Sequence, residues 1–331
     1  MLKQEVARLR PAWRFAFSRP GFCTFRLPES AAAEAQLALG ATFARTLGVS
    51  LGRVTGGADA ELAGAAGAVI EERLAKAPRH VHVWRRDRAL PGDPGFVPSD
   101  TAAQASALRE RLPNAAVNEH AAAGDAVLDC VIVEPNEWWL GWHRASGAAP
   151  ASRWPGGVPN IAAPAGMISR AYLKMTEALA WSELPLRAGD RCVEIGSAPG
   201  GACLALLERG CTVTGLDPAE MDPAVLAHPR FTHVRARAKD ARRSVFDDCR
   251  WLMSDANVAP TYTLDTVRPI VTAPGARVQG LLLTLKLTDR RLAAALPKLE
   301  ERVRAWGYPR VRTRQLAFNR QEICLAADRL T

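Results

Sequence analysis

From Ile168 to the C-terminus, short apolar runs rich in β-branched residues alternate with segments of helical spacing. The runs are Cys192–Ile195, Thr212–Leu216, Phe231–Val234, Trp251–Ser254 and Val278–Leu285. Strands that are apolar throughout are typical of a parallel sheet covered by helices on both faces. The second half of the chain is therefore predicted to be a doubly wound α/β domain. Such domains keep their ligands at the carboxyl edge of the sheet.

The first half mixes strand and helix patterns and is predicted to be α+β. Two short aromatic strands are expected within residues 13–27, around the turn Arg19-Pro20-Gly21. A helix at 59–76, a strand at 80–84, a helix at 100–112 and strands at 127–133 and 138–142 are expected to follow. A stretch rich in proline and glycine comes next and predicts a linker or a substrate-facing loop. The predicted parts are 1–50, a small α+β unit; 51–145, a second α+β region; 146–167, the linker; and 168–331, the α/β domain.

Composition narrows the partners of the chain. The formal net charge is +9, which favours a polyanion such as nucleic acid. We find no apolar run long enough for a membrane span and no signal-peptide pattern, so a cytoplasmic protein without a membrane partner is expected. The seven cysteines are scattered and form no C-x-x-C pair, so neither a metal site nor a disulfide framework is predicted. No sequence feature indicates the oligomeric state.

A glycine-rich turn, Gly196 to Gly201, follows the first apolar strand and precedes a helix. Its spacing matches neither the dinucleotide fingerprint nor the P-loop, and no lysine is placed to reach a phosphate. The next strand ends at Asp217, about 20 residues further on, where a carboxylate can accept hydrogen bonds from ribose hydroxyls. The pair predicts a nucleoside site, whereas the alternative is a tight turn with Asp217 as a helix cap.

The sequence E-I-G-S-A-P-G-G at Glu194–Gly201 resembles the D-L-G-x-x-P-G-G loop of the FtsJ-like ribose 2′-O-methyltransferases. It departs from the family pattern at Glu194, where aspartate is usual. The resemblance implies a Rossmann-like domain that binds S-adenosylmethionine. It also implies a set of cofactor-binding residues: Glu194, Gly196, Ser197, Ala198, Pro199, Gly200, Gly201, Asp217, Asp240 and Asp255.

Two of the implied cofactor contacts are given specific roles. Asp217 would hold the ribose of the cofactor, and Asp240 would contact its adenine. Asp240 has an alternative, since it lies among four arginines with which it could pair: Arg235, Arg237, Arg242 and Arg243.

Members of this family use a Lys-Asp-Lys-Glu tetrad, and the resemblance places it at Lys174, Asp255, Lys286 and Glu322. Lys174 lies in S-R-A-Y-L-K-M-T-E, which is similar to the family's S-R-x-x-x-K-L-x-E. The other three lie at the ends or beginnings of expected strands. Taken singly, each has a simpler explanation as a surface cation, a cap, a strand-end charge or a solvated edge residue.

The implied reaction explains the residue types. A ribose hydroxyl is a poor nucleophile, and its oxygen must lie in line with the methyl group and lose its proton as the bond forms. Lys286 is expected to lower the pKa of that hydroxyl, while Asp255 and Glu322 orient the two amines. The sulfonium leaves as a neutral group, so the reaction needs no metal.

The order of parts resembles the ribosomal RNA large subunit methyltransferase M family, which implies a THUMP-type RNA-binding domain at 51–145 and ribosomal RNA as partner. The same chemistry on tRNA or an RNA cap is the alternative within enzymes. A catalytically silent RNA-binding or ribosome-assembly protein is the alternative of another class. Arg290–Arg320 holds nine basic and two acidic residues and is expected to contact phosphates. The tryptophans at 138, 139 and 142 could stack bases or pack in the core.

Overall fold

The computed structural model describes residues 1–28, 39–74, 76–87, 100–287 and 289–330. The chain divides into two compact units, residues 2–160 and 161–331. The predicted boundary between residues 50 and 51 falls inside strand β3 (Val49–Thr55). The first unit also extends to Asn160, into the segment expected to be a linker. The THUMP-type identity of residues 51–145 stays a prediction.

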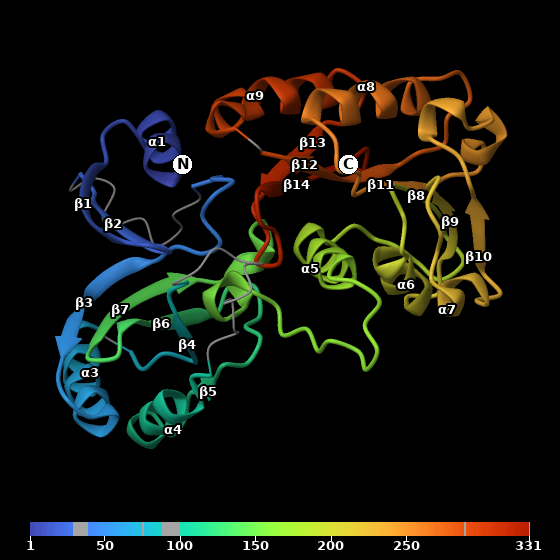
Figure 1. Ribbon diagram of the computed structural model, residues 1–331. Helices are drawn as coiled ribbons and strands as arrows, with labels where there is room; N and C mark the ends of the chain where they lie inside the picture. The colour runs from blue at the N-terminus through green and yellow to red at the C-terminus, as the bar shows by residue number, and fades with distance from the viewer. Residues whose placement is uncertain (29–38, 75, 88–99, 288, 331) are drawn as a thin grey trace. The chain divides into compact units, whose positions relative to one another are not determined.

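The first unit is built on a five-stranded sheet in the order β3-β7-β6-β4-β5 (Figure 1). Its strands after β3 are β4 (His80–Arg85), β5 (Ala116–Val117), β6 (Ala126–Glu134) and β7 (Glu137–Arg144). Helices α3 (Asp59–Arg73) and α4 (Ala102–Arg111) bury Leu62 and Leu108 against one face of this sheet. Strand β3 is absent from the sequence prediction, because Val49–Thr55 contains a glycine and polar residues that weaken the strand pattern.

A histidine on β7 ties the following segment to this sheet. His143 Nδ1 lies 2.6 Å from Asp129 Oδ2 on β6, and its Nε2 lies 2.7 Å from the carbonyl oxygen of Ser152. Ser152 belongs to the first of two short 3₁₀ helices, Pro150–Arg153 and Pro155–Gly157. This part of the predicted loop is therefore held on the first unit.

The N-terminal segment forms helix α1 (Leu2–Leu9) and the predicted two-stranded hairpin, β1 (Arg14–Arg19) and β2 (Phe22–Arg26). The Trp139 ring packs on two hairpin rings, with centroids 5.3 Å from Phe17 and 5.4 Å from Phe22. Trp138 is fully buried in the core of the sheet. Trp138 therefore packs in the core, and Trp139 is half-buried and packs on the hairpin.

The second unit contains a seven-stranded sheet in the order β10-β9-β8-β11-β12-β14-β13. The strands are β8 (Arg191–Ile195), β9 (Thr212–Leu216), β10 (Phe231–Val234), β11 (Trp251–Ser254), β12 (Gly280–Lys286), β13 (Arg310–Arg314) and β14 (Glu322–Asp328). The helices are α5 (Ala171–Ser182), α6 (Gly201–Glu208), α7 (Pro223–Leu226), α8 (Pro260–Val271) and α9 (Arg290–Arg304), with short 3₁₀ turns at Ala238–Asp240 and Arg243–Phe246. Helices α8 and α9 cover one face and α5 and α6 the other (Figure 1). The predicted α/β architecture is confirmed.

One part of the expected sheet differs. Strands β8 to β12 are parallel, but β14 runs antiparallel to both β12 and β13. The loop between β13 and β14 is only the seven residues 315–321, too short for the crossover that parallel neighbours need. Strand β13 was not predicted, because R-V-R-T-R has the charged pattern of an edge strand.

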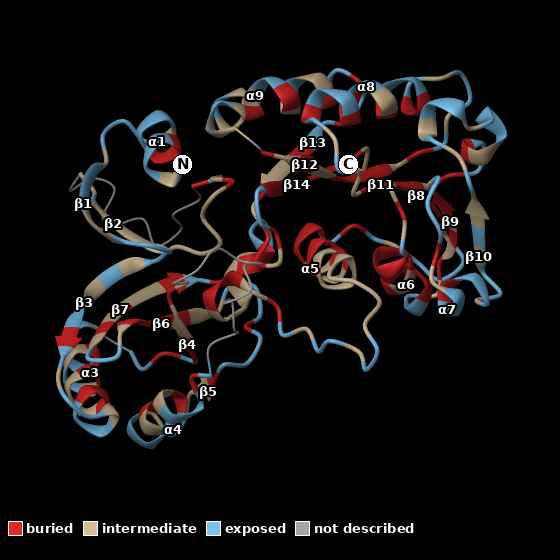
Figure 2. Ribbon diagram, viewed as in Figure 1, coloured by how far each residue is buried: buried red, intermediate tan, exposed pale blue. Residues whose placement is uncertain are grey.

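Burial follows the expected layers. The central strands of the second sheet and helix α6 are largely buried, while α8 buries only one side (Figure 2). Trp251, Leu252 and Met253 of β11 are completely inaccessible to solvent. None of the helices in the described ranges is long and apolar enough to cross a bilayer.

Candidate active site

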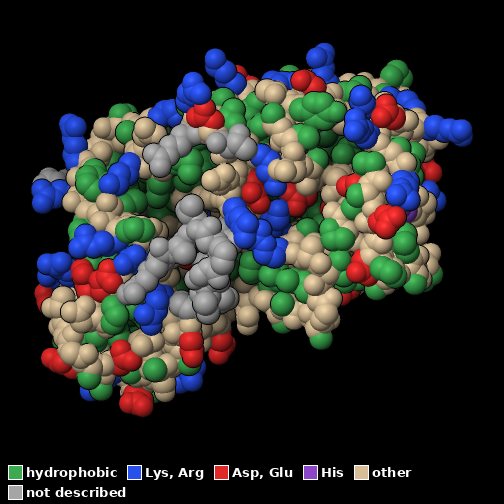
Figure 3. Space-filling model, viewed as in Figure 1, with side chains coloured by type: hydrophobic (Ala, Val, Ile, Leu, Met, Phe, Trp, Pro, Cys, Tyr) green, Lys and Arg blue, Asp and Glu red, His purple; other side chains and the backbone are tan. Residues whose placement is uncertain are grey.

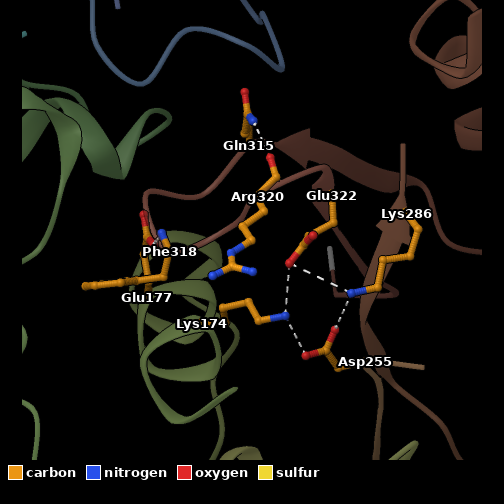
Figure 4. Close-up of polar contacts among 8 residues, drawn as sticks. All are labelled: Lys174, Glu177, Asp255, Lys286, Gln315, Phe318, Arg320 and Glu322. Atoms are coloured by element: carbon orange, nitrogen blue, oxygen red, sulfur yellow. Dashed lines mark hydrogen bonds and ion pairs between the residues drawn. The ribbon is translucent and has the colours of Figure 1, made fainter. Parts of the chain in front are cut away.

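The four residues predicted as a tetrad meet at the carboxyl edge of the second sheet (Figure 4). Lys174 Nζ lies 2.7 Å from Asp255 Oδ2 and 3.1 Å from Glu322 Oε1. Lys286 Nζ lies 3.6 Å from Asp255 Oδ1 and 3.8 Å from the same Glu322 oxygen. Two amines and two carboxylates therefore form one closed cluster, which excludes the separate surface explanations of these residues.

Helix α5, strands β12 and β14, and the residue after β11 carry these four side chains. Lys174 is in the first turn of α5, and Asp255 directly follows β11, where its N–H donates to the Ile195 carbonyl oxygen at 3.1 Å. Lys286 and Glu322 are directly opposed in the antiparallel register of β12 and β14. The antiparallel direction of β14, which the sequence did not predict, is therefore what brings the carboxylate of Glu322 to the lysines.

The two lysines have different surroundings. Burial alone would lower the pKa of the Lys174 ammonium, but Asp255 and Glu322 together raise it above its ordinary value. Lys174 is thus held as a cation by two short contacts. Lys286 makes longer contacts, and the buried Asp255 Oδ1 that faces it accepts no hydrogen bond from the described residues. Lys174 uses two of its three N–H donors on these carboxylates, whereas Lys286 lies at 3.6 Å or more from them and keeps more donor capacity for a substrate hydroxyl.

The glycine turn lies at the same edge, between β8 and α6. Gly196 has φ of +79°, and a Cβ there would lie 2.8 Å from Ala256 Cα, in the segment that follows Asp255. Gly200 has φ of +116° and is the N-cap residue that precedes α6. Both positions require the left-handed backbone that glycine adopts without strain. The turn therefore passes close to the cluster, as a cofactor loop must.

Asp217 links this turn to the end of β9. Its Oδ2 accepts from the Ala198 N–H at 3.2 Å and its Oδ1 accepts from the Ala219 N–H at 2.8 Å. Each carboxylate oxygen can accept a second hydrogen bond, so a ribose hydroxyl could still be bound. Asp217 thus has a structural task that its predicted role did not include.

The other predicted cofactor residues differ in how far they are buried. Glu194 is buried under the turn, where it accepts a hydrogen bond from Cys203 Sγ at 2.8 Å, and burial raises its pKa to about 8. Its direct contact with a cofactor stays a prediction. Asp240 is exposed in a 3₁₀ turn, and within the described ranges it forms no ion pair with the four neighbouring arginines. Ser197 is buried, and its hydroxyl contacts Met221 Sδ at 3.6 Å.

Glu177 is a site residue whose role the sequence analysis missed. It is buried on α5, three residues after Lys174, and its carboxylate accepts the N–H groups of Ala317 and Phe318 at 2.8 and 3.1 Å. These bonds hold the β13–β14 loop, which leads to Glu322, against the helix of Lys174 (Figure 4). The spacing from Lys174 was the available signal, since residues three apart share a helix face.

Most arginines of the basic stretch Arg290–Arg320 contact other groups of the protein. Four of its arginines pair with acids: Arg291 with Asp289, Arg302 with Asp265, Arg304 with Glu300 and Arg310 with Asp328. Arg312 lies over the Trp181 ring, and Arg314 is buried. These six residues already contact other groups of the protein, and phosphate binding by this stretch stays a prediction. Arg320, by contrast, extends toward the tetrad (Figure 4).

Comparison with known proteins agrees with this site. Residues 167–301 match the FtsJ-like methyltransferase family model. The chain is 32% identical over 192 residues to the ribosomal RNA large subunit methyltransferase M of Halorhodospira halophila, covering 57% of this chain and 55% of that protein. It is 33% identical over 194 residues to the protein of the same name from Methylococcus capsulatus, covering 56% of this chain and 53% of that one. The chain thus spans about half the length of the curated relatives it matches.

Among solved structures, the Methanococcus jannaschii fibrillarin pre-rRNA processing protein resembles the chain with a TM-score of 0.38 and 8% identity, covering 60% of this chain and 81% of that one. The match of residues 167–301 lies within the unit that carries the tetrad and the glycine turn. This part of the second unit is therefore similar to the FtsJ-like methyltransferase family.

Proposed function

We propose that the chain is an S-adenosylmethionine-dependent ribose 2′-O-methyltransferase that acts on RNA, with large-subunit ribosomal RNA as its substrate. The observation that carries the proposal is the closed Lys-Asp-Lys-Glu cluster beside a glycine turn. The names of the curated relatives support the choice of ribosomal RNA. A ribosomal RNA substrate would place the protein in the cytoplasm.

The residues at the sheet edge suit the proposed cofactor. Gly196 and Gly200 shape the turn, and Asp217 at the end of β9 keeps acceptor capacity on both carboxylate oxygens. Asp255 lies after the adjacent strand β11, between the turn and the lysines. S-adenosylmethionine bound there would supply a methyl group on a positively charged sulfur.

The chain's own residues would prepare the hydroxyl. Lys286 would donate a hydrogen bond to the 2′-oxygen and stabilise the negative charge that develops on it. The hydroxyl proton would pass to solvent water as the new carbon–oxygen bond forms and the carbon–sulfur bond of the methyl donor breaks. Lys174 supplies one positive charge beside the carboxylates of Asp255 and Glu322, and Lys286 supplies the second, so the cluster has no net negative charge to repel the oxygen. The cluster carries two positive and two negative charges when all four groups are ionised, which suits a site where one proton must be lost.

The test is Lys286→Ala in the full chain, assayed for methyl transfer to ribosomal RNA. We expect the rate to fall on the order of 10²-fold or more, the usual scale for losing a group that assists proton transfer. Cofactor binding should be nearly unchanged, and Arg277→Ala, which alters an exposed arginine paired with Asp248, should retain full activity. The product should resist alkaline cleavage at the modified nucleotide, because a methylated 2′-oxygen cannot attack the adjacent phosphate. A methyl group on a base, or full activity of Lys286→Ala, would refute the proposal.

A further inference from the structure

The N-terminal helix and hairpin carry a one-sided charge. Residues 1–28 contain six lysines and arginines and a single acid, Glu5. That acid is buried, and its carboxylate accepts the N–H groups of Thr42 and Phe43 at 2.9 and 3.1 Å. Lys and Arg side chains gather on the surface over β1 and β2 (Figure 3). This surface is therefore positive without a nearby acid from its own segment.

Two of these arginines face each other at the open end of the hairpin. Arg14 of β1 and Arg26 of β2 are directly opposed in the antiparallel register, and both are exposed. Like charges in opposed positions destabilise a strand pair. An anion bound near both guanidinium groups would remove that repulsion, and a phosphate suits their planar donor geometry.

A bulge next to this pair turns an aromatic ring to the surface. The register shifts between Phe15 and Phe17, so Phe15 pairs with Phe25 while Phe17 pairs with Thr24. Adjacent pairs point to opposite faces, so Phe17 is free to pack on Trp139 and Phe15 lies on the other face. Phe15 remains 50% exposed, with Lys3 Nζ 4.0 Å from its ring centroid. An exposed phenylalanine beside cations is suited to base stacking.

We infer that the open end of the β1–β2 hairpin binds single-stranded RNA that passes around this end, with a phosphate near Arg14 and Arg26 on one face and a base against Phe15 on the opposite face. This inference rests on the proposed RNA substrate and adds the surface that would hold a part of it outside the tetrad. An acidic protein could satisfy the arginines, but it would leave the exposed ring without the stacking partner that every nucleobase offers.

The test measures binding of a fluorescent single-stranded RNA oligonucleotide to the full chain by anisotropy, without cofactor. The double variant Arg14→Ala/Arg26→Ala should lower affinity about tenfold or more and reduce the slope of log K against log salt by roughly 0.7 for each phosphate that is no longer neutralised. Phe15→Ala should lower affinity by about fivefold or more with the salt slope unchanged. The matched control is Arg73→Ala, an exposed arginine of α3 that pairs with Glu72, and it should bind as the wild type does.

The melting temperature of each variant distinguishes a role in RNA binding from a role in stabilising the fold. Removing two opposed arginines should leave the melting temperature equal or raise it, because their mutual repulsion disappears. Wild-type affinity and salt slope in the double variant would overturn the inference. So would equally strong competition by polyglutamate, which would indicate an acidic protein partner. The binding assay does not measure methyl transfer, so its result can be interpreted even if the Lys286→Ala test fails.

Discussion

At the scale of single residues, the two lysines of the cluster are chemically unequal. Lys174 contacts both carboxylates at 3.1 Å or less, and Lys286 lies at 3.6 Å or more from each. Removing Lys174 would leave two nearly buried carboxylates without their short ion pairs, which costs about 3–5 kcal/mol in comparable pairs. Lys174 therefore stabilises the two carboxylates, and Lys286 is the lysine proposed to act on the substrate.

Glu194 should make folding stability depend on pH. Its pKa rises from an ordinary 4.5 to about 8 through burial, so the folded state holds a proton that the unfolded state releases. The stability it contributes is full below about pH 4.5 and is lost as the pH rises toward 8. Glu194→Gln keeps the shape of the protonated acid and cannot ionise. Between pH 5 and 8.5, we expect the free energy of unfolding of the variant to increase relative to that of the wild type by on the order of a few kcal/mol.

Thermal unfolding at these two pH values measures the effect, with the exposed Glu301→Gln as control. An equal difference in melting temperature between wild type and Glu194→Gln at both pH values would contradict the prediction.

Asp217 should affect both the cofactor and the turn. Asp217→Ala removes the acceptor for the N–H groups of Ala198 and Ala219 as well as the proposed ribose contact. We expect S-adenosylmethionine affinity in isothermal titration to fall about tenfold or more, as expected when hydrogen bonds to a charged group are removed. Asp222→Ala removes a carboxylate that caps α7 through Ala224 N–H, and it should lower stability without that decrease in affinity. Unchanged affinity in Asp217→Ala would reject the ribose role.

At the scale of elements, the site depends on a clamp between α5 and the β13–β14 loop. Glu177 holds Ala317 and Phe318, and Gln315 Nε2 donates to the Arg320 carbonyl oxygen at 3.2 Å. Glu322 begins β14 directly after this loop. The position of the Glu322 carboxylate relative to Lys174 therefore depends on the backbone hydrogen bonds that Glu177 accepts from this loop.

Glu177→Gln tests this positioning role. A glutamine has one acceptor oxygen, whereas the two N–H groups of the loop donate to separate oxygens of Glu177. In the variant, one N–H group would face the amide NH₂, which also donates, and the free energy of unfolding would fall by about 1–3 kcal/mol. We expect a lower melting temperature and a lower kcat for methyl transfer, with KM for the cofactor little changed. The control Glu220→Gln alters an exposed side chain of the same unit. A lower stability with kcat intact would show that Glu177 supports the fold and not the site.

At the scale of the whole molecule, the net charge is +9, and the basic segments that could bind RNA differ in how many of their side chains pair with acids. Several arginines of residues 290–320 pair with acids, whereas the basic residues of the N-terminal segment have one buried acid among them. Surface cations outside ion pairs contribute most to phosphate binding, because they neutralise phosphates without first breaking a pair. The N-terminal segment is thus expected to contribute strongly to RNA affinity.

RNA binding by the full chain should fall steeply with salt. Each neutralised phosphate makes the slope of log K against log salt steeper by about 0.7 for single strands. The slope should be nearly the same for the wild type and for Lys286→Ala, since that lysine is assigned to one hydroxyl. Affinity measured by anisotropy over a series of salt concentrations gives the slope. A flat dependence would contradict an electrostatic interface and the RNA substrate with it.

Local patterns by themselves determined much of the second unit. The apolar runs predicted β8 to β12, and the glycine turn, Asp217 and the tetrad were found from short motifs. Such features depend on residues close in sequence, whose spacing reports strand burial and turn conformation directly. The family match of residues 167–301 confirms the resemblance drawn from those motifs.

The tertiary structure decided what depends on residues far apart in the chain. The antiparallel β14 sets Glu322 opposite Lys286, the fold brings Glu177 to a loop 140 residues away, and a bulge sends Phe15 and Phe17 to opposite faces. The pairing of arginines with acids and the raised pKa values of Lys174 and Glu194 likewise arise from contacts across the fold. Strand register and long-range electrostatics are set by the packing of distant elements, so no local pattern records them.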